Sequence, residues 1–215
     1  MSYCTNVKYT CGLCGNTFHS NTYISYTAFG TPDLDLRPPE MQRSTMPLWA
    51  KECPACGLVS RGNIRDEENK KHKDYIESEE YKTCQNQEIS SSLARKFYKC
   101  ALIELQENNK RDAYESFLCG AWACDDLFDV DGAKICRKKA IELFEDTDMK
   151  EDPELVLRQV DLLRRVGEFK KALTLLKTIK FKDITLWKIG LFQRNLCRKK
   201  DTSCYRVSDY RAKRR

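Results

Sequence analysis

The sequence is poor in histidine, in long apolar runs and in catalytic signatures, and each shortage excludes a class of protein. Only His19 and His72 occur among 215 residues, so serine–histidine triads and paired imidazole acid–base groups have little to draw on. The chain has no glycine-rich phosphate loop and no nucleophile elbow. No apolar stretch approaches the roughly 18–20 residues of a membrane-spanning helix. We therefore predict a protein that is neither an enzyme nor a membrane protein.

The first ten residues, MSYCTNVKYT, also lack the basic stretch and the apolar run of an export signal. We therefore expect a cytoplasmic, reducing location, where disulfides are rare and CxxC pairs more often bind a metal or act in catalysis. Against these shortages stands an abundance of cysteine, with 12 residues. How the chain uses its cysteines is therefore the main question that its composition raises.

Two cysteine pairs carry the strongest signal, in CGLCG at residues 11–15 and in ECPACG at residues 52–57. A CxxC turn supplies two thiolate ligands for a tetrahedral Zn²⁺. The glycine that follows permits a positive φ, which directs backbone N–H groups at the sulfurs. The 38 residues between the pairs exceed the roughly 15–20 of compact zinc ribbons. We predict a zinc ribbon with an enlarged middle and a closed structural site, whose ligands are Cys11, Cys14, Cys53 and Cys56.

Other uses of the two pairs stay open. A thioredoxin-like centre needs its CxxC at the N-terminus of a helix, and neither pair precedes an apolar pattern of helical period. Two disulfides need an oxidising compartment. His19, five residues after Cys14, is an alternative fourth ligand. The site would also act as a thiol-based redox switch if oxidation released the metal.

The insert between the pairs contains a charged segment, FGTPDLDLRPPEMQRSTM, at residues 29–46. Leucine and aspartate alternate in it, which predicts a short strand with Leu34 and Leu36 on one face. The segment is either a recognition loop or a set of ion pairs that holds the insert against the ribbon. The candidate recognition residues are Asp33, Asp35, Arg37 and Arg43.

From about residue 88 the apolar residues recur with helical period, and the capping residues predict six helices. Asp152 is a candidate N-cap with Pro153 at the first helical position, Gly167 ends that helix, and Asp183 caps the last one. Cys100, Cys124 and Cys136 lie on the apolar stripes and are expected in the core. The predicted class is α+β, mostly α, with four parts: a zinc-ribbon-like module at 1–62, a charged connector at 63–87, a helical domain at 88–198 and a basic tail at 199–215.

The helical part contains a weak internal repeat. RRVGEFKKALTLLKTI, Arg164–Ile179, is similar to the turn and second helix of a tetratricopeptide repeat, and Leu118–Phe144 is a looser copy. Ala133 and Ala172 are 39 residues apart, against about 34 in that repeat. We predict a short tetratricopeptide-like array. A plain helical bundle is the alternative.

The positive charge of the chain is confined to its C-terminus. Residues 1–83 carry 10 Lys and Arg against 11 Asp and Glu, and residues 84–197 carry 20 against 19. Residues 198–215 carry 8 against 2. A nucleic-acid-binding protein usually spreads its basic residues over a folded face, so we expect a solvated, frayed tail.

Several motifs resemble those of one family. CGLCG, FGTPDLDLRPPE, WAKECPACG, IESEEY and LCGAWACDD are similar to segments of an uncharacterised bacterial family, a domain of unknown function. The resemblance covers roughly residues 11–192. It implies an N-terminal zinc-ribbon-like module with the same four cysteine ligands, followed by tetratricopeptide-like helices, and it implies no activity. The stretch LFDVDG departs from the family pattern and leaves the repeat boundaries open.

We therefore predict a non-enzymatic, zinc-binding interaction or adaptor protein. The zinc has a structural role, and the helical array offers a groove to a protein or peptide partner. Two alternatives stay open: a nucleic-acid-binding protein that uses the ribbon and the basic tail, and the thiol-based redox switch. The sequence indicates neither the identity of the partner nor the oligomeric state.

Overall fold

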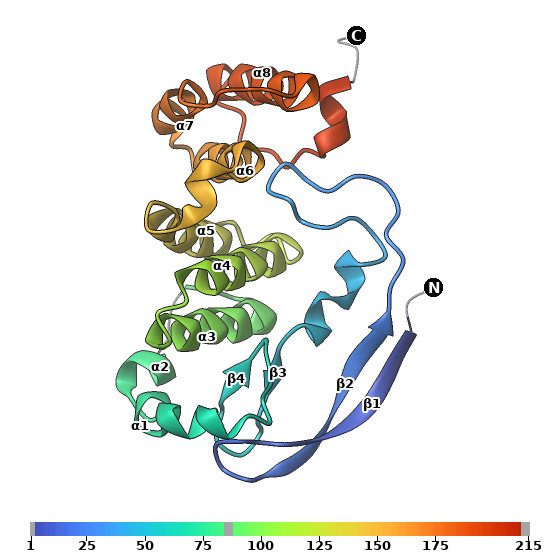
Figure 1. The fold of residues 1–215 in the computed structure, drawn as a ribbon, viewed down its shortest axis with the longest axis vertical. Coiled ribbons are helices and arrows are strands. Elements are labelled where there is room, and N and C mark those ends of the chain that lie inside the picture. Colours follow the sequence, from blue (N-terminus) through green and yellow to red (C-terminus); the bar gives the residue numbers. More distant parts are fainter. Residues whose placement is uncertain (1–2, 84–87, 212–215) are drawn as a thin grey trace.

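The computed structural model describes residues 3–83 and 88–211, in which a small β part is followed by a stack of helices (Figure 1). This agrees with the predicted α+β, mostly α, class. Cys84 and the last four residues of the basic tail lie outside the described residues. None of the described helices is both long enough and apolar enough to cross a membrane.

The β part consists of two separate antiparallel hairpins. The long hairpin pairs Thr10 with Thr17 at its turn and Tyr3 with Ser25 at its open end. The short hairpin pairs Lys51 with Ser60. Each predicted CxxC segment is the turn of one hairpin, which places both cysteine pairs at hairpin ends. The strands are β1 (Tyr3–Thr10), β2 (Thr17–Ser25), β3 (Lys51–Glu52) and β4 (Val59–Ser60).

The insert between the hairpins is a loop followed by the 3-10 helix η1 (Arg43–Leu48). The predicted strand in this loop is wrong, because Leu36 has a φ of 63° and its N–H donates to the carbonyl of Asp33. The chain turns there, so the alternating pattern does not place the two leucines on one face. Asp33 makes only an isolated β-bridge, with Arg206 near the C-terminus.

The charged segment after the ribbon is packed against the rest of the protein. Ile76 and Tyr81, its few apolar side chains, are buried. Their burial holds three short elements over the ribbon and the first long helix although most of the neighbouring side chains are charged. These elements are η2 (Glu67–His72), α1 (Lys73–Ile76) and α2 (Glu79–Thr83).

The prediction of six helices beyond residue 88 is confirmed within the described residues. The side chain of Asp152 accepts a hydrogen bond from the N–H of Glu154, and Asp183 does so from Thr185, so both predicted N-caps are present. Gly167, with a φ of 87°, follows α6 as predicted. The helices are α3 (Ser92–Gln106), α4 (Lys110–Asp125), α5 (Val130–Phe144), α6 (Pro153–Arg165), α7 (Phe169–Leu176) and α8 (Ile184–Arg198).

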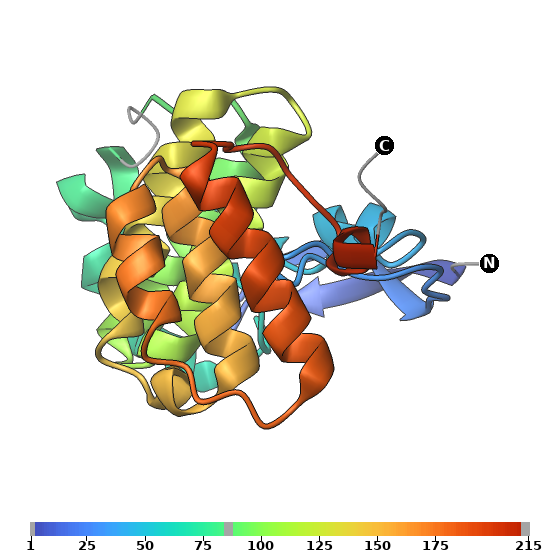
Figure 2. The ribbon, with the colours of Figure 1, turned by 90° about the horizontal axis from the view of Figure 1, so that it is seen from above.

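The helices α3 to α7 each pack on the next helix in sequence, and α8 packs on both α6 and α7. The six helices are stacked along the long axis of the molecule (Figure 1). Figure 2 shows the helices α6 to α8 from above. One apolar cluster runs from the cysteine turns through α3, α4 and α5 into α6. A second cluster joins α6, α7 and α8 and includes Leu34 from the insert. Cys100, Cys124 and Cys136 are buried in the first cluster, so their predicted core role is confirmed.

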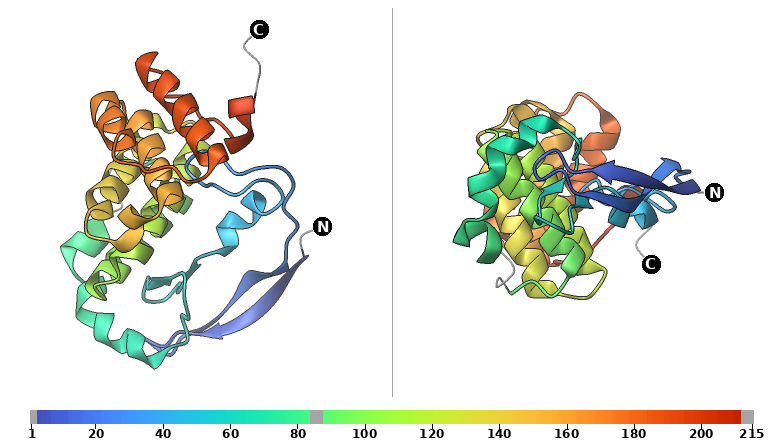
Figure 3. Two further views of the ribbon diagram at one scale, coloured as in Figure 1. Left: turned by 45° about the horizontal axis from the view of Figure 1, so that its top comes forward. Right: turned by 90° about the horizontal axis from the view of Figure 1, so that it is seen from below.

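The prediction of a frayed C-terminus is wrong for residues 201–211. The carbonyl of Tyr205 accepts from the N–H of Leu34, and the N–H of Val207 donates to the carbonyl of Pro32. The 3-10 helix η5 (Val207–Arg211) follows. This segment and the β1–β2 hairpin lie on the same side of the helical stack (Figures 2 and 3). The C-terminal segment is therefore hydrogen-bonded to the insert between the two hairpins.

Candidate metal centre

The four predicted ligands come together at the ends of the two hairpins. Cys11 and Cys14 lie in the turn that joins β1 to β2, and Cys53 and Cys56 lie in the turn that joins β3 to β4. One ligand-capable atom of each residue lies within 4.8 Å of the corresponding atoms of the other three. Within residues 3–83 and 88–211 this is the only such cluster of three or more histidine, cysteine or acidic side chains.

The spacing of the sulfurs fits a tetrahedral zinc ion. The Sγ atoms of Cys11 and Cys56 are 3.8 Å apart, and those of Cys14 and Cys53 are 3.6 Å apart. Zn–S bonds of about 2.3 Å in a tetrahedron require sulfur–sulfur distances of about 3.8 Å. Both contacts connect one turn to the other, so an ion at the centre would hold the two hairpins together. Four thiolates also close the coordination shell, which suits a structural ion rather than a catalytic one.

The backbone of each turn is shaped as the sequence predicts. Gly15 and Gly57 both have a φ of 74°, and their N–H groups donate to the carbonyls of Cys11 and Cys53. Burial opposes ionisation of Cys53, but N–H groups of Cys56 and Ala55 outweigh it and lower the pKa of this thiol to about 7. The N–H groups of the turn thus stabilise the thiolate form that a metal requires.

The pKa shifts in the opposite direction at two other thiols of the cluster. Burial raises the pKa of Cys11, although backbone N–H groups of Cys14 and Leu13 oppose it. Burial raises the pKa of Cys56 more strongly, and the neighbouring thiols add to this effect. Four thiolates crowded into one site would repel each other, and a bound divalent cation would supply the charge that allows them to ionise together.

Groups that the sequence analysis did not identify support the two turns. The side-chain amide of Asn16 donates to the Sγ of Cys53 at 3.9 Å. The hydroxyl of Tyr81 donates to the carbonyl of Gly57 and accepts from the N–H of Val59, just after the second turn. At Gly12 a Cβ atom would lie 1.9 Å from the carbonyl oxygen of Asp66, so only glycine lets the first turn dock on the connector.

The alternative ligand His19 is wrong. This residue lies in β2, where it pairs with Lys8. Its Nδ1 is 2.8 Å from the side-chain oxygen of Asn6, and it does not belong to the sulfur cluster. A thioredoxin-like arrangement is absent as well, since the elements that follow the two turns are the strands β2 and β4.

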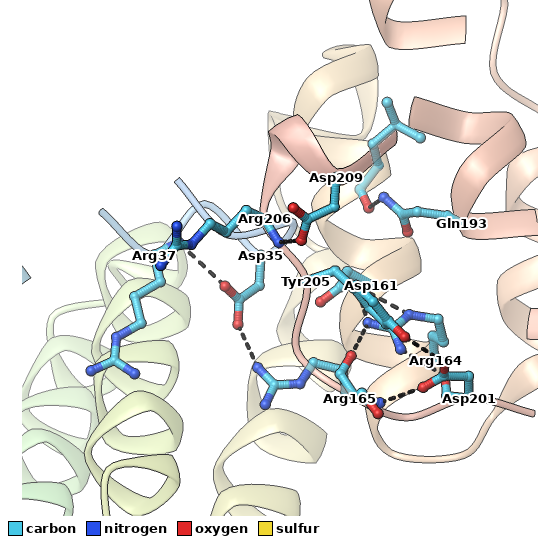
Figure 4. Close-up of polar contacts among 12 residues, drawn as sticks. Asp35, Arg37, Asp161, Arg164, Arg165, Gln193, Asp201, Tyr205, Arg206 and Asp209 are labelled. Carbon is cyan, nitrogen blue, oxygen red and sulfur yellow. Dashed lines mark hydrogen bonds and ion pairs between the residues drawn. The ribbon is translucent and has the colours of Figure 1, made fainter. Parts of the chain in front are cut away.

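The structure places the candidate recognition segment against the helices instead of beside the cysteines. Asp35 is 1% exposed, and its Oδ2 accepts from Trp122 of α4 at 2.9 Å and from Arg165 of α6 at 3.1 Å. Burial opposes ionisation here, but the charges of Arg165 and Arg137 outweigh it and hold the pKa of Asp35 below its usual value. Figure 4 shows Asp35 directed at Arg165 from the insert.

The other three candidates form ion pairs of their own, although the backbone N–H of Arg37 also donates to the carboxylate of Asp35. Arg43 pairs with Asp33 at 2.7 Å, and Arg37 pairs with Asp126 of α4 at 2.6 Å. Neither pair contains Asp35, so the four residues do not converge on one open site. In this structure they tie the insert to itself and to the helices. Their partners on the helices come 87 to 130 residues later in the sequence. No local sequence pattern indicates a pairing between residues so far apart.

Arg164 organises a second group of polar contacts in the same region (Figure 4). Its side chain is fully buried and donates to Asp161 at 2.6 Å. It also donates to the backbone carbonyls of Asp201 and Ser203. Adjacent arginines of α6 therefore hold two distant segments, because Arg165 binds the insert and Arg164 binds the C-terminal segment.

Comparison with known proteins found no matching family model, no matching curated protein and no matching solved structure. Of the family resemblance in the sequence, the structure supports the cysteine cluster that is compatible with zinc.

Proposed function

We propose that this chain is a non-enzymatic interaction protein, in which a structural zinc ion organises the N-terminal hairpins beside a tetratricopeptide-like array. The observation that carries the proposal is the convergence of four thiols from two hairpins within 4.8 Å. A cluster of this kind organises a small β unit that has too little apolar surface of its own. The proposed partner is a protein or peptide.

The array is the part proposed to present a binding surface. Helices that stack in chain order produce extended faces of the kind that solenoid proteins use for peptides. The face near Trp122, Arg137 and Arg165 already holds Asp35 of the insert. We therefore place the partner elsewhere, on the surface between the ribbon and the first helices of the array, where a large cavity lies.

The first experiment measures metal. Elemental analysis of the natively purified full-length chain is expected to find one zinc per molecule, and Cys53→Ser is expected to lose it. Cys204→Ser is the matched control, because that thiol is exposed and lies outside the cluster. A wild-type protein without stoichiometric metal, folded and monodisperse, would overturn the proposal.

A further inference from the structure

A cavity lies between the ribbon and the first helices of the array. Its volume is about 680 Å³, within the usual range of ligand sites. One wall comes from the β1–β2 hairpin and η1, and the opposite wall from α3 and α4. The side chains that matter below are Tyr23, Tyr26, Trp49, Lys51, Arg61 and Glu104.

A smaller cavity of about 240 Å³ adjoins it, since both are lined by Arg61, Gly62, Glu104 and Asp112. The lining of the smaller cavity is strongly acidic. It contains one arginine and five carboxylates, which are Asp66, Glu68, Glu104, Glu107 and Asp112. Glu107 is paired with Lys71 and His72, and the remaining carboxylates still exceed the single arginine.

Glu104 occupies the junction of the two cavities. One of its carboxylate oxygens accepts a hydrogen bond from the hydroxyl of Ser116, and Arg61 donates to that hydroxyl at 3.1 Å. Burial raises the pKa of Glu104 to about 7, although Ser116 and Arg61 oppose the rise. The hydrogen bond from Ser116 and the charge of Arg61 therefore do not fully compensate the carboxylate of Glu104 for its loss of solvent. A further cation near this carboxylate would stabilise its ionised form.

Two tyrosines that line the larger cavity, Tyr23 and Tyr26, are partly exposed to solvent. Tyr23 and Tyr26 are 39% and 43% exposed and touch each other edge to face at 5.7 Å. Within the described residues neither hydroxyl has a hydrogen-bond partner. Trp49 is more fixed, because its Nε1 donates to Thr45. Exposed, adjacent tyrosines offer ring faces to an incoming side chain.

The cations of the larger cavity are already engaged. The Nζ of Lys51 donates to the carbonyls of Asn21 and Leu48 at 2.9 and 2.6 Å, and burial lowers the pKa of this amine. Arg61 is tied to Ser116 beside Glu104. The donors of Lys51 are occupied by carbonyls and Arg61 lies beside Glu104, whereas the adjoining smaller cavity has more carboxylates than cations. The charge of the smaller cavity therefore favours a cation.

We propose that the two cavities bind an extended peptide segment of a partner protein, with an arginine or lysine directed at Glu104 and an aromatic or aliphatic neighbour on Tyr23 and Tyr26. This deepens the proposed function, because it names the surface and the chemistry of the partner. The acidic smaller cavity receives the basic group, and the wider cavity with its tyrosines receives the apolar neighbour. The charge balance of the lining and the unused ring faces are independent observations that lead to the same ligand.

The test uses full-length, zinc-loaded protein and a fluorescein-labelled peptide of alternating arginine and tryptophan, with binding read by fluorescence anisotropy. Glu104→Gln keeps the shape and the Ser116 contact but removes the charge, so it is expected to weaken binding roughly tenfold or more. Tyr26→Ser removes an exposed ring and is expected to weaken binding about three- to fivefold. Glu142→Gln is the matched control, because this exposed carboxylate of α5 pairs with Lys139 on the same helix, and it is expected to leave binding unchanged.

Several results would overturn the proposal. Equal binding of wild type and Glu104→Gln removes the assigned site, and so does equal binding of a peptide in which glutamate replaces arginine. Displacement of the peptide by an equal concentration of spermidine means that the site takes a free polyamine. Self-association that Glu104→Gln abolishes makes the occupant a second copy of the chain. The zinc content is read separately, so a failed peptide site with one bound zinc is distinguishable from failure of the proposed function.

Discussion

The ribbon and the helical array are each stabilised by different interactions. Along β1 and β2 no side chain is fully buried, so this hairpin contributes little apolar stabilisation, and two-stranded hairpins are marginal by themselves. In α4, by contrast, eleven of the residues are buried. The β1–β2 hairpin therefore depends on the contacts at its turn, whereas the array depends on apolar packing along its whole length. The short β3–β4 hairpin lies between these cases, because Leu58 and Val59 are buried in the same apolar cluster as α3.

The cysteines show the same contrast. In the ribbon, thiols of different turns face each other and backbone N–H groups are directed at them. In the array, burial raises the pKa of Cys119 to about 12 and that of Cys197 to about 11, although Arg61 and Arg164 oppose these shifts. Such thiols remain protonated and pack as small apolar groups. Burial also raises the pKa of Cys11 and Cys56 in the ribbon, so the convergence of two turns on one point is what distinguishes the candidate ligands from the array cysteines.

Removal of the metal is expected to give the largest difference between the two regions. A chelator, or Cys53→Ser, is expected to release the hairpins while α4 to α8 remain folded, because zinc–thiolate sites contribute apparent free energies on the order of 10 kcal/mol to small units. Amide hydrogen exchange measures this region by region. Loss of protection in the ribbon with the array intact is the expected pattern, and simultaneous loss throughout the chain would contradict the comparison.

Asp35→Ala tests the joint between the two regions. It removes the acceptor of the Trp122 indole and one of the two carboxylates that face Arg165 and Arg137, of which Asp125 remains. Because the arginines keep Asp125, we expect a cost near the lower end for a broken buried pair, about 3 kcal/mol of unfolding free energy. Asp131→Ala is the control, because this carboxylate is 80% exposed and its loss is expected to cost less than about 0.5 kcal/mol. Urea unfolding measures both. Equal stabilities would show that the insert does not depend on Asp35.

Glu104→Gln tests how a buried carboxyl between the two regions affects the stability of the fold as the pH changes. Burial raises the pKa of Glu104 from 4.5 to about 7, so its protonated form stabilises the fold at low pH and this stabilisation is lost as the pH rises through about 7. The neutral amide avoids that loss. The variant is therefore expected to be more stable than wild type at pH values above 7, on the order of 2 kcal/mol. Thermal unfolding across pH checks whether the gap narrows toward pH 4.5.

Tyr81→Phe gives the smallest expected effect and refines the picture of the ribbon. The change removes the hydroxyl that bonds Gly57 and Val59 behind the second cysteine turn but keeps the buried ring. We expect a loss of about 1 kcal/mol and faster release of zinc to a chelator. A competition assay with a chromogenic chelator measures the release. An unchanged rate would mean that the hydroxyl does not support the metal turn.

Predictions based on local patterns agree with the structure. The capping residues Asp152 and Asp183 and the glycine at 167 lie at the expected ends of helices. Gly15 and Gly57 have the expected positive φ. These features depend on a few neighbouring residues, whose backbone preferences can be judged without knowledge of the rest of the chain.

Predictions that depended on the path of the chain were less successful. Alternation in residues 33–37 predicts a strand, but contacts with the helices and with the C-terminal segment hold a turn there. The C-terminal segment looks solvated from its charge, yet Thr31 and Ser208, 177 residues apart, are bonded side chain to side chain. Pairing over such separations in sequence is decided by tertiary packing, about which a local sequence pattern carries no information.

The sequence alone determined the candidate metal ligands and the succession of helices, because a CxxC turn and an amphipathic helix are each specified by residues close together in the chain. Only the tertiary structure decided what the charged insert does. Many arginines could have paired with Asp35, and the stacking of α4, α5 and α6 brought Arg137 and Arg165 to it. A buried charge requires a partner within a few ångströms, and the identity of that partner depends on how the whole chain folds.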